Sequence, residues 1–307
     1  MAPPQVREHV RLPNFVIVGA AKCGTTSLFH YLKQHPDVYL PVKKELHYFA
    51  YDPLRSNAGG PGGARGLAFA CATREQYDSY YRDVGAEGAI GEVSPSYFYF
   101  AEVSENIKAE LGGPRIVILL RDPIEKAYSQ YMHLVRDNLE SLPFFEGLIA
   151  EPDRAASGWP AMWRYAESSL YSQRVRKYLE VFGAERVKIF LFEDLVRNPG
   201  RVLGTLYEFL STGPGGEVDT SRVYNRTGPP CSRLLADLLA RPNPVTAAAR
   251  RWLPEDLRDR VRNAMLNLNT GRKDAIDDRS RAYLRASFAD DVQELERLLG
   301  RQLGWLS

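Results

Sequence analysis

The strand-to-helix turn at residues 14–32, "NFVIVGAAKCGTTSLFHYL", limits the possible folds of this chain more than any other stretch. An apolar run typical of a buried strand leads into a loop that contains Gly19 and Gly24, and an amphipathic helical pattern follows. A strand joined to a helix in this way opens a βαβ unit, so a parallel sheet is expected. The turn also directs backbone N–H groups and the positive end of the helix dipole toward one point, which suits an anion such as phosphate.

The lysine of this loop lies in an unusual place. In the nucleotide-binding loop G-x-x-x-x-G-K-[ST], the lysine directly follows the second glycine. Here Thr25 occupies that position, and the lysine of the loop, Lys22, lies two residues before Gly24. Thr25, Thr26 and Ser27 add three hydroxyls at the first turn of the helix. The pattern predicts a phosphate cradle that differs from the common nucleotide loop, and a glycine-rich turn without a ligand is the alternative.

Apolar runs alternate with amphipathic patterns along the chain. The predicted strands are residues 15–18, 89–93, 116–120 and 187–192. The predicted helices are residues 25–34, 123–138, 168–182, 199–210 and 279–299. Strands that alternate with helices of this length predict an α/β fold with a P-loop-like central parallel sheet flanked by helices. Ligands of such sheets bind at the carboxyl ends of the strands.

Length and composition fit one large domain. The 307 residues are 44% hydrophobic and 11% aromatic, which is enough for a sizeable core. We therefore expect a single domain over residues 1–307. Within it, the glycine-rich stretch 56–66 predicts a mobile surface loop, with a lid over a substrate as the alternative, and the Arg- and Pro-rich stretch 225–272 predicts an irregular helical segment.

Several classes of protein do not fit this composition. A formal charge of +2 gives no general footprint for nucleic acid. Cys23, Cys71 and Cys231 are odd in number and lack CxxC or His spacing, so neither a disulfide framework nor a zinc site is predicted. No apolar run has the length of a signal peptide core or a membrane span. We expect a cytoplasmic protein without a membrane or nucleic-acid partner; no stretch predicts an oligomer interface.

A second motif follows the third predicted strand. In "RIVILLRDPIEKAYSQY" the strand ends at Arg121, Asp122 and Pro123 begin a helix, and Ser129 lies two turns into it. Arginine recognises phosphate through two parallel hydrogen bonds, and a serine hydroxyl can complete that contact. Phosphate sites on two neighbouring strands would indicate a ligand with two separate phosphate groups. A structural ion pair of Arg121 is the alternative.

Together these residues resemble the PAPS-dependent sulfotransferases, with motifs most similar to the carbohydrate (heparan-sulfate-type) and related bacterial enzymes. The 5'-phosphosulfate loop of that family matches "AAKCGTTSL", and its 3'-phosphate motif, R-D-P-x-x-[KR]-A-x-S-x-Y, matches residues 121–131 at every fixed position. The resemblance implies PAPS as the donor, PAP as its product and no metal. It also implies that Lys22 steadies the bridging oxygen as the sulfuryl group leaves. The donor-binding residues that it implies are Lys22, Cys23, Gly24, Thr25, Thr26, Ser27, Arg121, Ser129 and Tyr171.

Two further parts of the donor site follow from the same resemblance. Tyr171 lies near the start of the block 169–210, in which the family has a tyrosine that faces the adenine; a core aromatic is the alternative for this residue. The heparan-sulfate branch also closes a K-G-R loop on the donor. The corresponding loop here ends at Arg272 and lacks the lysine, so Arg226 and Arg233 are rivals for that contact.

The stretch 41–52, "PVKKELHYFAYD", resembles the K-E-x-H-[FY]-F segment of the carbohydrate sulfotransferases. A hydroxyl that attacks sulfur must lose its proton, and Glu45 is the predicted general base. In an extended segment His47 shares the face of Glu45, so it is expected to orient that carboxylate or the acceptor. His47 as the base is a rival assignment. A surface ion pair of Glu45 with Lys43 or Lys44 is the structural alternative.

The sequence therefore predicts in-line transfer of the sulfuryl group of PAPS to a hydroxyl, with an amine as second choice. The acceptor class is a small metabolite, a glycoside or a saccharide. Val93 stands where the heparan-sulfate branch often has a lysine, which argues against a highly anionic polysaccharide. The alternatives are a P-loop kinase-like phosphotransferase, which would need ATP and Mg²⁺, and a non-catalytic protein that binds PAP or PAPS.

Overall fold

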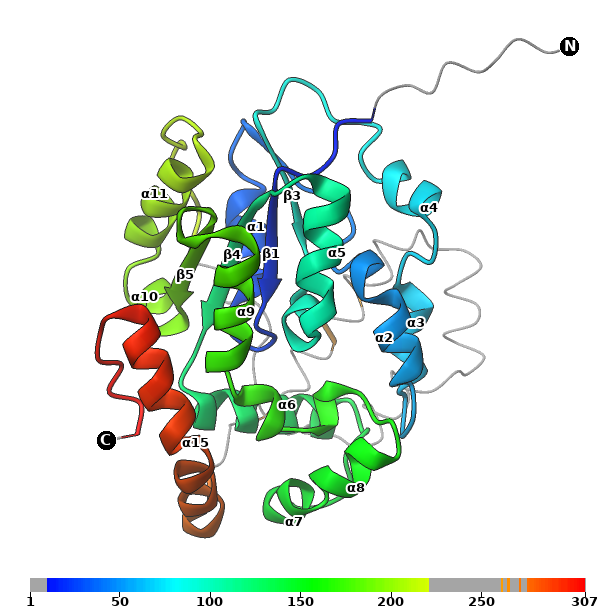
Figure 1. Ribbon diagram of the computed structural model, residues 1–307, viewed down its shortest axis with the longest axis vertical. Coiled ribbons are helices and arrows are strands. Elements are labelled where there is room, and N and C mark those ends of the chain that lie inside the picture. The colour runs from blue at the N-terminus through cyan, green and yellow to red at the C-terminus, as the bar shows by residue number, and fades with distance from the viewer. Residues whose placement is uncertain (1–9, 221–260, 262–263, 266–270, 272–274, 307) are drawn as a thin grey trace, which may run out of the picture. The chain divides into compact units, whose positions relative to one another are not determined.

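The computed structural model describes residues 10–220, 261, 264–265, 271 and 275–306 (Figure 1). These residues belong to two compact units. Of the described residues, the sheet unit comprises 10–55, 66–120 and 174–220. The helical unit comprises 56–65, 121–173 and the described residues from 261 onward. The single domain expected from the sequence stays a prediction.

The sheet unit contains five parallel strands in the order β2-β3-β1-β4-β5. Their bounds are β1 (Phe15–Gly19), β2 (Val38–Tyr39), β3 (Ala89–Val93), β4 (Arg115–Leu120) and β5 (Val187–Leu191). The predicted α/β fold with a parallel sheet is confirmed, and the four predicted strands agree within one residue at each end. The sequence did not reveal β2, because a strand of two residues has no detectable periodicity.

The centre of the sheet is strand β1, whose five residues are all buried. Phe15 pairs with Gly91 of β3 on one side and with Arg115 of β4 on the other. Gly91 is needed there because a Cβ at this position would lie 2.1 Å from Cζ of the Phe15 ring. Continuous apolar runs such as β1 and β4 are typical of parallel strands covered on both faces.

Helices cover both faces of this sheet, and Figure 1 shows α5 and α9 in front of the strands and α1 behind them. The helices of the sheet unit are α1 (Thr25–Leu32), α2 (Tyr51–Ser56), α3 (Ala64–Phe69), α4 (Arg74–Ser79), α5 (Ala101–Leu111), α9 (Ser172–Phe182), α10 (Phe192–Arg197) and α11 (Pro199–Leu210). An ion pair of 2.5 Å between Lys177 and Glu105 links α9 to α5. Ring contacts between Phe98 and Tyr178, with centroids 6.1 Å apart, join α9 to the turn that follows β3.

Among the described residues, the helices of the helical unit are α6 (Pro123–Arg136), α7 (Phe144–Ile149), α8 (Glu151–Ala156) and α15 (Asp278–Leu299), with short 3-10 turns between them. Asp122 caps α6 by accepting the backbone N–H groups of Ile124 and Glu125 at 2.8 and 3.2 Å. The predicted helix over residues 168–182 is interrupted, and α9 begins only at Ser172. The reason is that Asp291 of α15 accepts the N–H groups of Tyr171 and Ser172, at 2.7 and 3.0 Å.

Two stretches were predicted to be irregular, and the structure describes only the first of them in full. In the stretch 56–66 the last residues already belong to α3, and the N–H of Gly59 donates to the carbonyl of Gly158 at 3.0 Å. Its predicted mobility stays a prediction. The predicted irregular segment 225–272 lies almost wholly outside the described residues.

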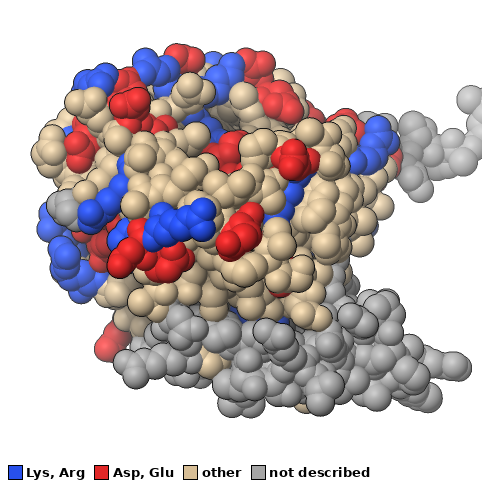
Figure 2. Space-filling view, turned by 90° about the horizontal axis from the view of Figure 1, so that it is seen from below, with Lys and Arg blue, Asp and Glu red and all other residues tan. Residues whose placement is uncertain are grey.

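On the face that Figure 2 shows, basic and acidic side chains are interspersed. This pattern agrees with the formal charge of only +2. Within the part of the chain that the structure describes, no helix is both long and apolar enough to cross a membrane.

Candidate active site

The glycine loop, residues 19–27, joins the carboxyl end of β1 to the first turn of α1. Gly24 is the N-cap of α1 and has a φ of 89°, in the left-handed region that favours glycine. Because the N-cap residue is a glycine, it has no side chain to accept from the first N–H groups of the helix. Lys22 also has a positive φ, of 67°, which turns the chain back toward the helix. The loop therefore has the backbone arrangement of an anion cradle.

The predicted contacts of this loop fall into two classes. Lys22, Gly24, Thr26 and Ser27 are partly exposed. Cys23 and Thr25 are buried, and the Cys23 thiol lies 3.6 Å from the carbonyl oxygen of Ala21. A ligand would therefore meet these two buried residues through their backbone N–H groups rather than through their side chains.

The Glu45 segment, residues 43–50, lies at the carboxyl end of β3, next to β1. The N–H of Glu45 donates to the carbonyl of Val93 at 2.9 Å, which fixes the segment to the end of the strand. The backbone is not extended, contrary to the expectation from the sequence, because Glu45 and His47 have φ values of 69° and 54°. Each such residue costs roughly 1–2 kcal/mol relative to a right-handed conformation. Other interactions must therefore hold this segment in place.

The side chains of Glu45 and His47 nevertheless lie near each other, and the predicted role of His47 stays a prediction. Nε2 of His47 lies 3.7 Å from Oε2 of Glu45, and Lys44 donates to Oε1 of the same carboxylate. The Glu45 side chain is 44% exposed, whereas that of His47 is 11% exposed. The ion pair with Lys44 agrees with the structural alternative, but it leaves much of the carboxylate open to solvent.

The His47 ring is held in one orientation. Burial lowers the pKa of His47 below its ordinary value of 6.5, against the opposing effect of Glu45. Nδ1 of the ring lies 2.7 Å from the hydroxyl of Ser96. If Ser96 donates this hydrogen bond, the neutral ring carries its proton on Nε2 and presents it to Glu45. Sequence reasoning missed Ser96, although it stands in the quoted family-like stretch 91–100, "GEVSPSYFYF".

The second predicted phosphate motif lies in the helical unit. Arg121 directly follows β4 in the chain, and its guanidinium lies 3.9 Å from the carboxylate of Glu125. Arg281 lies 3.7 Å from the other oxygen of Glu125, so this carboxylate stands between two arginines. Ser129 is only 1% exposed, on the buried side of α6. This geometry agrees only in part with the ion-pair alternative for Arg121, because 3.9 Å between its guanidinium and the Glu125 carboxylate is long for an ion pair.

Tyr171 is a core residue of the helical unit. Its side chain is fully buried, its hydroxyl donates to the carbonyl of Arg121 at 3.0 Å, and its ring contacts Trp305 edge to face. These contacts agree with the core-aromatic alternative and fix the backbone of Arg121. The adenine contact of Tyr171 stays a prediction, and Arg226, Arg233 and Arg272 lie outside the described residues.

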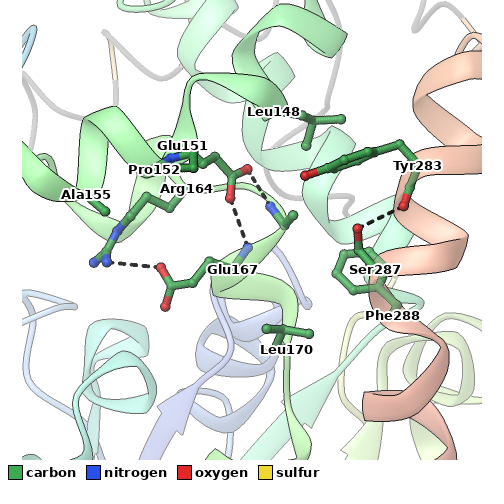
Figure 3. Close-up of a pocket in the computed structure, with 11 residues that line it drawn as sticks. Leu148, Glu151, Pro152, Ala155, Arg164, Glu167, Leu170, Tyr283, Ser287 and Phe288 are labelled. Atoms are coloured by element: carbon green, nitrogen blue, oxygen red, sulfur yellow. Dashed lines mark hydrogen bonds and ion pairs between the residues drawn. The ribbon is translucent and has the colours of Figure 1, made fainter.

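The helical unit also contains a cavity of about 340 Å³ that includes none of the predicted site residues (Figure 3). Glu151 lines it and accepts the N–H groups of Ala166 and Glu167 at 2.7 and 3.0 Å. Burial raises the pKa of Glu151 to about 7, against these two hydrogen bonds. Because both carboxylate oxygens are used by the backbone, Glu151 anchors a turn.

Comparison with known proteins identifies the family. The profile described as "Sulfotransferase family" matches residues 13–213, more than half of the 307 residues. The chain belongs to the sulfotransferase family. A solved sulfotransferase from Alicyclobacillus acidocaldarius is 33% identical to this sulfotransferase with a TM-score of 0.77, over 97% of this chain and 100% of that one. The resemblance to the sulfotransferases found in the sequence is thereby confirmed.

A curated human relative and a solved mouse structure are similar to this sulfotransferase at lower sequence identity. Human heparan sulfate glucosamine 3-O-sulfotransferase 3B1 is 27% identical over 259 residues, which are 82% of this chain and 59% of the human protein. The chain thus spans about three fifths of the length of that relative. Mouse sulfotransferase SULT7A1, solved in complex with PAP, shares the fold at 13% identity and a TM-score of 0.51, over 95% of this chain and 88% of that one.

Proposed function

We propose that this sulfotransferase moves the sulfuryl group of PAPS to a hydroxyl of a glycoside, a saccharide or a small metabolite, with Glu45 as the general base. One observation carries the proposal. The glycine loop after β1 and the Glu45–His47 pair at the end of β3 lie at the same edge of the sheet, on neighbouring parallel strands. A phosphate cradle and an exposed carboxylate at one edge suit group transfer from a phosphate-bearing donor.

The glycine loop fits the 5'-phosphosulfate end of the donor. When bound, PAPS supplies the sulfuryl group and departs as PAP. The backbone N–H groups at the start of α1 and the ammonium group of Lys22 would hold this end. Their fixed positive charge stabilises the negative charge that develops on the leaving phosphate. The motif match at residues 121–131 supports Arg121 as the contact of the 3'-phosphate.

The Glu45 carboxylate would accept the proton of the acceptor hydroxyl while that oxygen forms its bond to sulfur. The bond between sulfur and the phosphate oxygen breaks in the same in-line step. Neutral His47, turned toward Glu45 by Ser96, orients the carboxylate through Nε2. The exposure of the Glu45 side chain supports this assignment, since the more buried His47 is less accessible to an acceptor.

The acceptor class is proposed from two observations. The name of the human relative states glucosamine in heparan sulfate as its acceptor, which supports a saccharide or glycoside here. The buried Val93 offers no charge for a polyanionic chain where that branch often has a lysine. We therefore favour a neutral glycoside or a short saccharide as the acceptor. Its attacking group is a hydroxyl, with an amine as second choice.

The donor half of the proposal is tested by titrating the purified chain with PAP, ADP and ATP–Mg²⁺. Tight binding of PAP without metal is expected. It should weaken about 10- to 100-fold in Lys22→Ala and in Arg121→Ala, since each loses charge-assisted hydrogen bonds. Lys33→Ala, which removes a lysine near the other end of α1, is the matched control and should bind PAP normally. Preference for ATP–Mg²⁺ would instead favour a kinase-like phosphotransferase.

The acceptor half is tested by screening glycosides, short saccharides, phenols and amines for sulfation by PAPS. Glu45→Gln is expected to lower the rate about 10²- to 10⁴-fold, the range for a lost general base, with PAP affinity within twofold of wild type. Unchanged rates in Glu45→Gln would remove Glu45 as the base. If no acceptor is sulfated while PAP binds tightly, a non-catalytic PAP-binding protein becomes the better description.

A further inference from the structure

A buried carboxylate on β3 gathers three hydroxyl groups. Glu92 is 1% exposed, and it accepts hydrogen bonds from the hydroxyls of Tyr77 at 2.7 Å, Ser94 at 2.8 Å and Tyr97 at 2.5 Å. All three donors are themselves fully buried. Such a network inside a core is costly unless every member has its partners. Nothing in the proposed chemistry uses Glu92 directly.

Two of these hydroxyls also contact the backbone of the Glu45 segment. The Ser94 hydroxyl accepts the N–H of His47 at 3.2 Å, and the Tyr97 hydroxyl accepts the N–H of Phe49 at 3.3 Å. A hydroxyl has a single proton, and both hydroxyls give theirs to Glu92. Their lone pairs are then left to accept from the segment. The carboxylate therefore sets the direction of both hydrogen bonds.

The Glu45 segment depends on such external support. Glu45 and His47 both have left-handed backbone conformations that residues with side chains rarely adopt. Val93, Ser94 and Tyr97 accept hydrogen bonds from the backbone at Glu45, at His47 and just after them. Loss of one of them would let the segment relax and would move the Glu45 carboxylate.

We propose that Glu92 is a positioning residue that holds Glu45 and His47 in their reactive arrangement through the hydroxyls of Ser94 and Tyr97. This inference rests on the proposed role of Glu45. Glu92 does not touch the acceptor or the donor. It acts by polarising two hydroxyls that bind the backbone beside the base.

The third hydroxyl provides a matched control. Tyr77 donates to Glu92 at 2.7 Å, between the lengths of the Ser94 and Tyr97 bonds, but within the described part of the chain its hydroxyl makes no hydrogen bond to the Glu45 segment. Its ring packs on Tyr48 and Phe49, and that packing is kept in Tyr77→Phe. Tyr77→Phe and Tyr97→Phe each remove one buried hydroxyl from the same carboxylate. Only Tyr97→Phe and Ser94→Ala remove an acceptor of the segment.

The first readout needs no acceptor. Nitrogen-15 NMR of the histidine rings, with the His47 signal assigned from His47→Asn, reports the tautomer and environment of His47. We expect this signal to shift or broaden in Ser94→Ala and Tyr97→Phe and to stay in place in Tyr77→Phe. The second readout is the turnover of PAPS to PAP with water as the acceptor. The turnover number should fall about 10- to 100-fold in the first two variants, the scale of a misplaced catalytic group.

PAP affinity and a double-mutant comparison distinguish a positioning role of Glu92 from a general loss of stability. PAP affinity should stay within twofold in all variants, so the loss appears in turnover alone. In a Glu92→Gln background, Tyr97→Phe should cost less than it does alone, because the hydroxyl is no longer polarised in the same way. Equal losses in Tyr77→Phe and Tyr97→Phe, or an unmoved His47 signal in Tyr97→Phe, would overturn the inference. Absence of PAP binding in the wild type would instead refute the proposed function, and the His47 signal would still test the network.

Discussion

The glycine loop and the Glu45 segment lie at the same edge of the sheet, yet they are held in different ways. The glycine loop takes much of its shape from residues within it, since Gly24 caps α1 at a positive φ, and Lys22 is its one left-handed residue that is not a glycine. The Glu45 segment has no glycine at its two left-handed residues, and distant groups on and after β3 hold it. One element is specified locally and the other by the surrounding fold.

This difference predicts different responses to mutation. A locally specified element fails when its own residues change, whereas an externally held element also fails when its supports change. The glycine loop should therefore be sensitive at few positions. The Glu45 segment should be sensitive at positions far from it in sequence.

Within the glycine loop, the largest expected effect is that of removing Lys22. Lys22→Ala should lower the rate of sulfuryl transfer about 10²- to 10³-fold, because one fixed charge that stabilises the leaving group is lost. Single-turnover measurements with PAPS would show it, with Lys33→Ala as the control. A rate loss equal in both lysine variants would contradict a specific role for Lys22.

The next prediction tests whether Gly24 itself fixes the shape of the glycine loop. Gly24→Ala should destabilise the fold by about 1–3 kcal/mol and weaken PAP binding, because alanine is strained at a φ of 89°. Its Cβ would also lie 2.9 Å from Cδ2 of Phe192. Gly204→Ala is the control: no atom lies within 4 Å of its Cβ on α11, and it should gain about 0.5–1 kcal/mol. Urea unfolding of both variants measures the contrast.

A smaller effect tests the strain in the Glu45 segment. Glu45→Asn and Glu45→Gln both remove the carboxylate, but asparagine accepts a left-handed backbone more readily. We expect Glu45→Asn to be more stable than Glu45→Gln by about 0.5–1 kcal/mol. Equal unfolding free energies would show that the positive φ at Glu45 carries no cost.

The smallest effect concerns pH. Burial lowers the pKa of His47, so the unfolded chain takes up this proton first as the pH falls. The stabilisation that depends on neutral His47 is present above its ordinary pKa of 6.5 and is lost as the pH falls through and below that value. Wild type should lose stability relative to His47→Asn between about pH 7 and pH 5. If the unfolding free energies of wild type and His47→Asn changed with pH in parallel, this prediction would be contradicted.

Much of the fold followed from local sequence patterns. The apolar runs of β1 and β4 and the glycines after β1 each act within a few residues, so their strands were predicted nearly to their ends. The break before α9 depends on Asp291, which is remote in sequence, and no local pattern shows it. The short β2 strand was missed because it forms only by pairing with β3.

The candidate site shows the same division. The spacing of Lys22 and Gly24 predicts a strand-to-helix loop, and the structure has that loop. Their contacts with a donor stay a prediction. Glu45 and His47 were expected to lie together on an extended segment, and they lie together on a left-handed backbone that is hydrogen-bonded to Val93, Ser94 and Tyr97. The burial of Ser129 and Tyr171 likewise arises from packing within the helical unit.

The strand order of the sheet also governs when this site can form during folding. Strand β1 pairs only with β3 and β4 among the described strands, and both come much later in the chain. The nearer strand, β2, pairs with β3 instead. Pairing between distant segments is slow, because loop closure must precede any gain. A growing chain that has not yet reached Ala89 carries the apolar β1 without a strand partner, and we expect it to need protection from aggregation during synthesis.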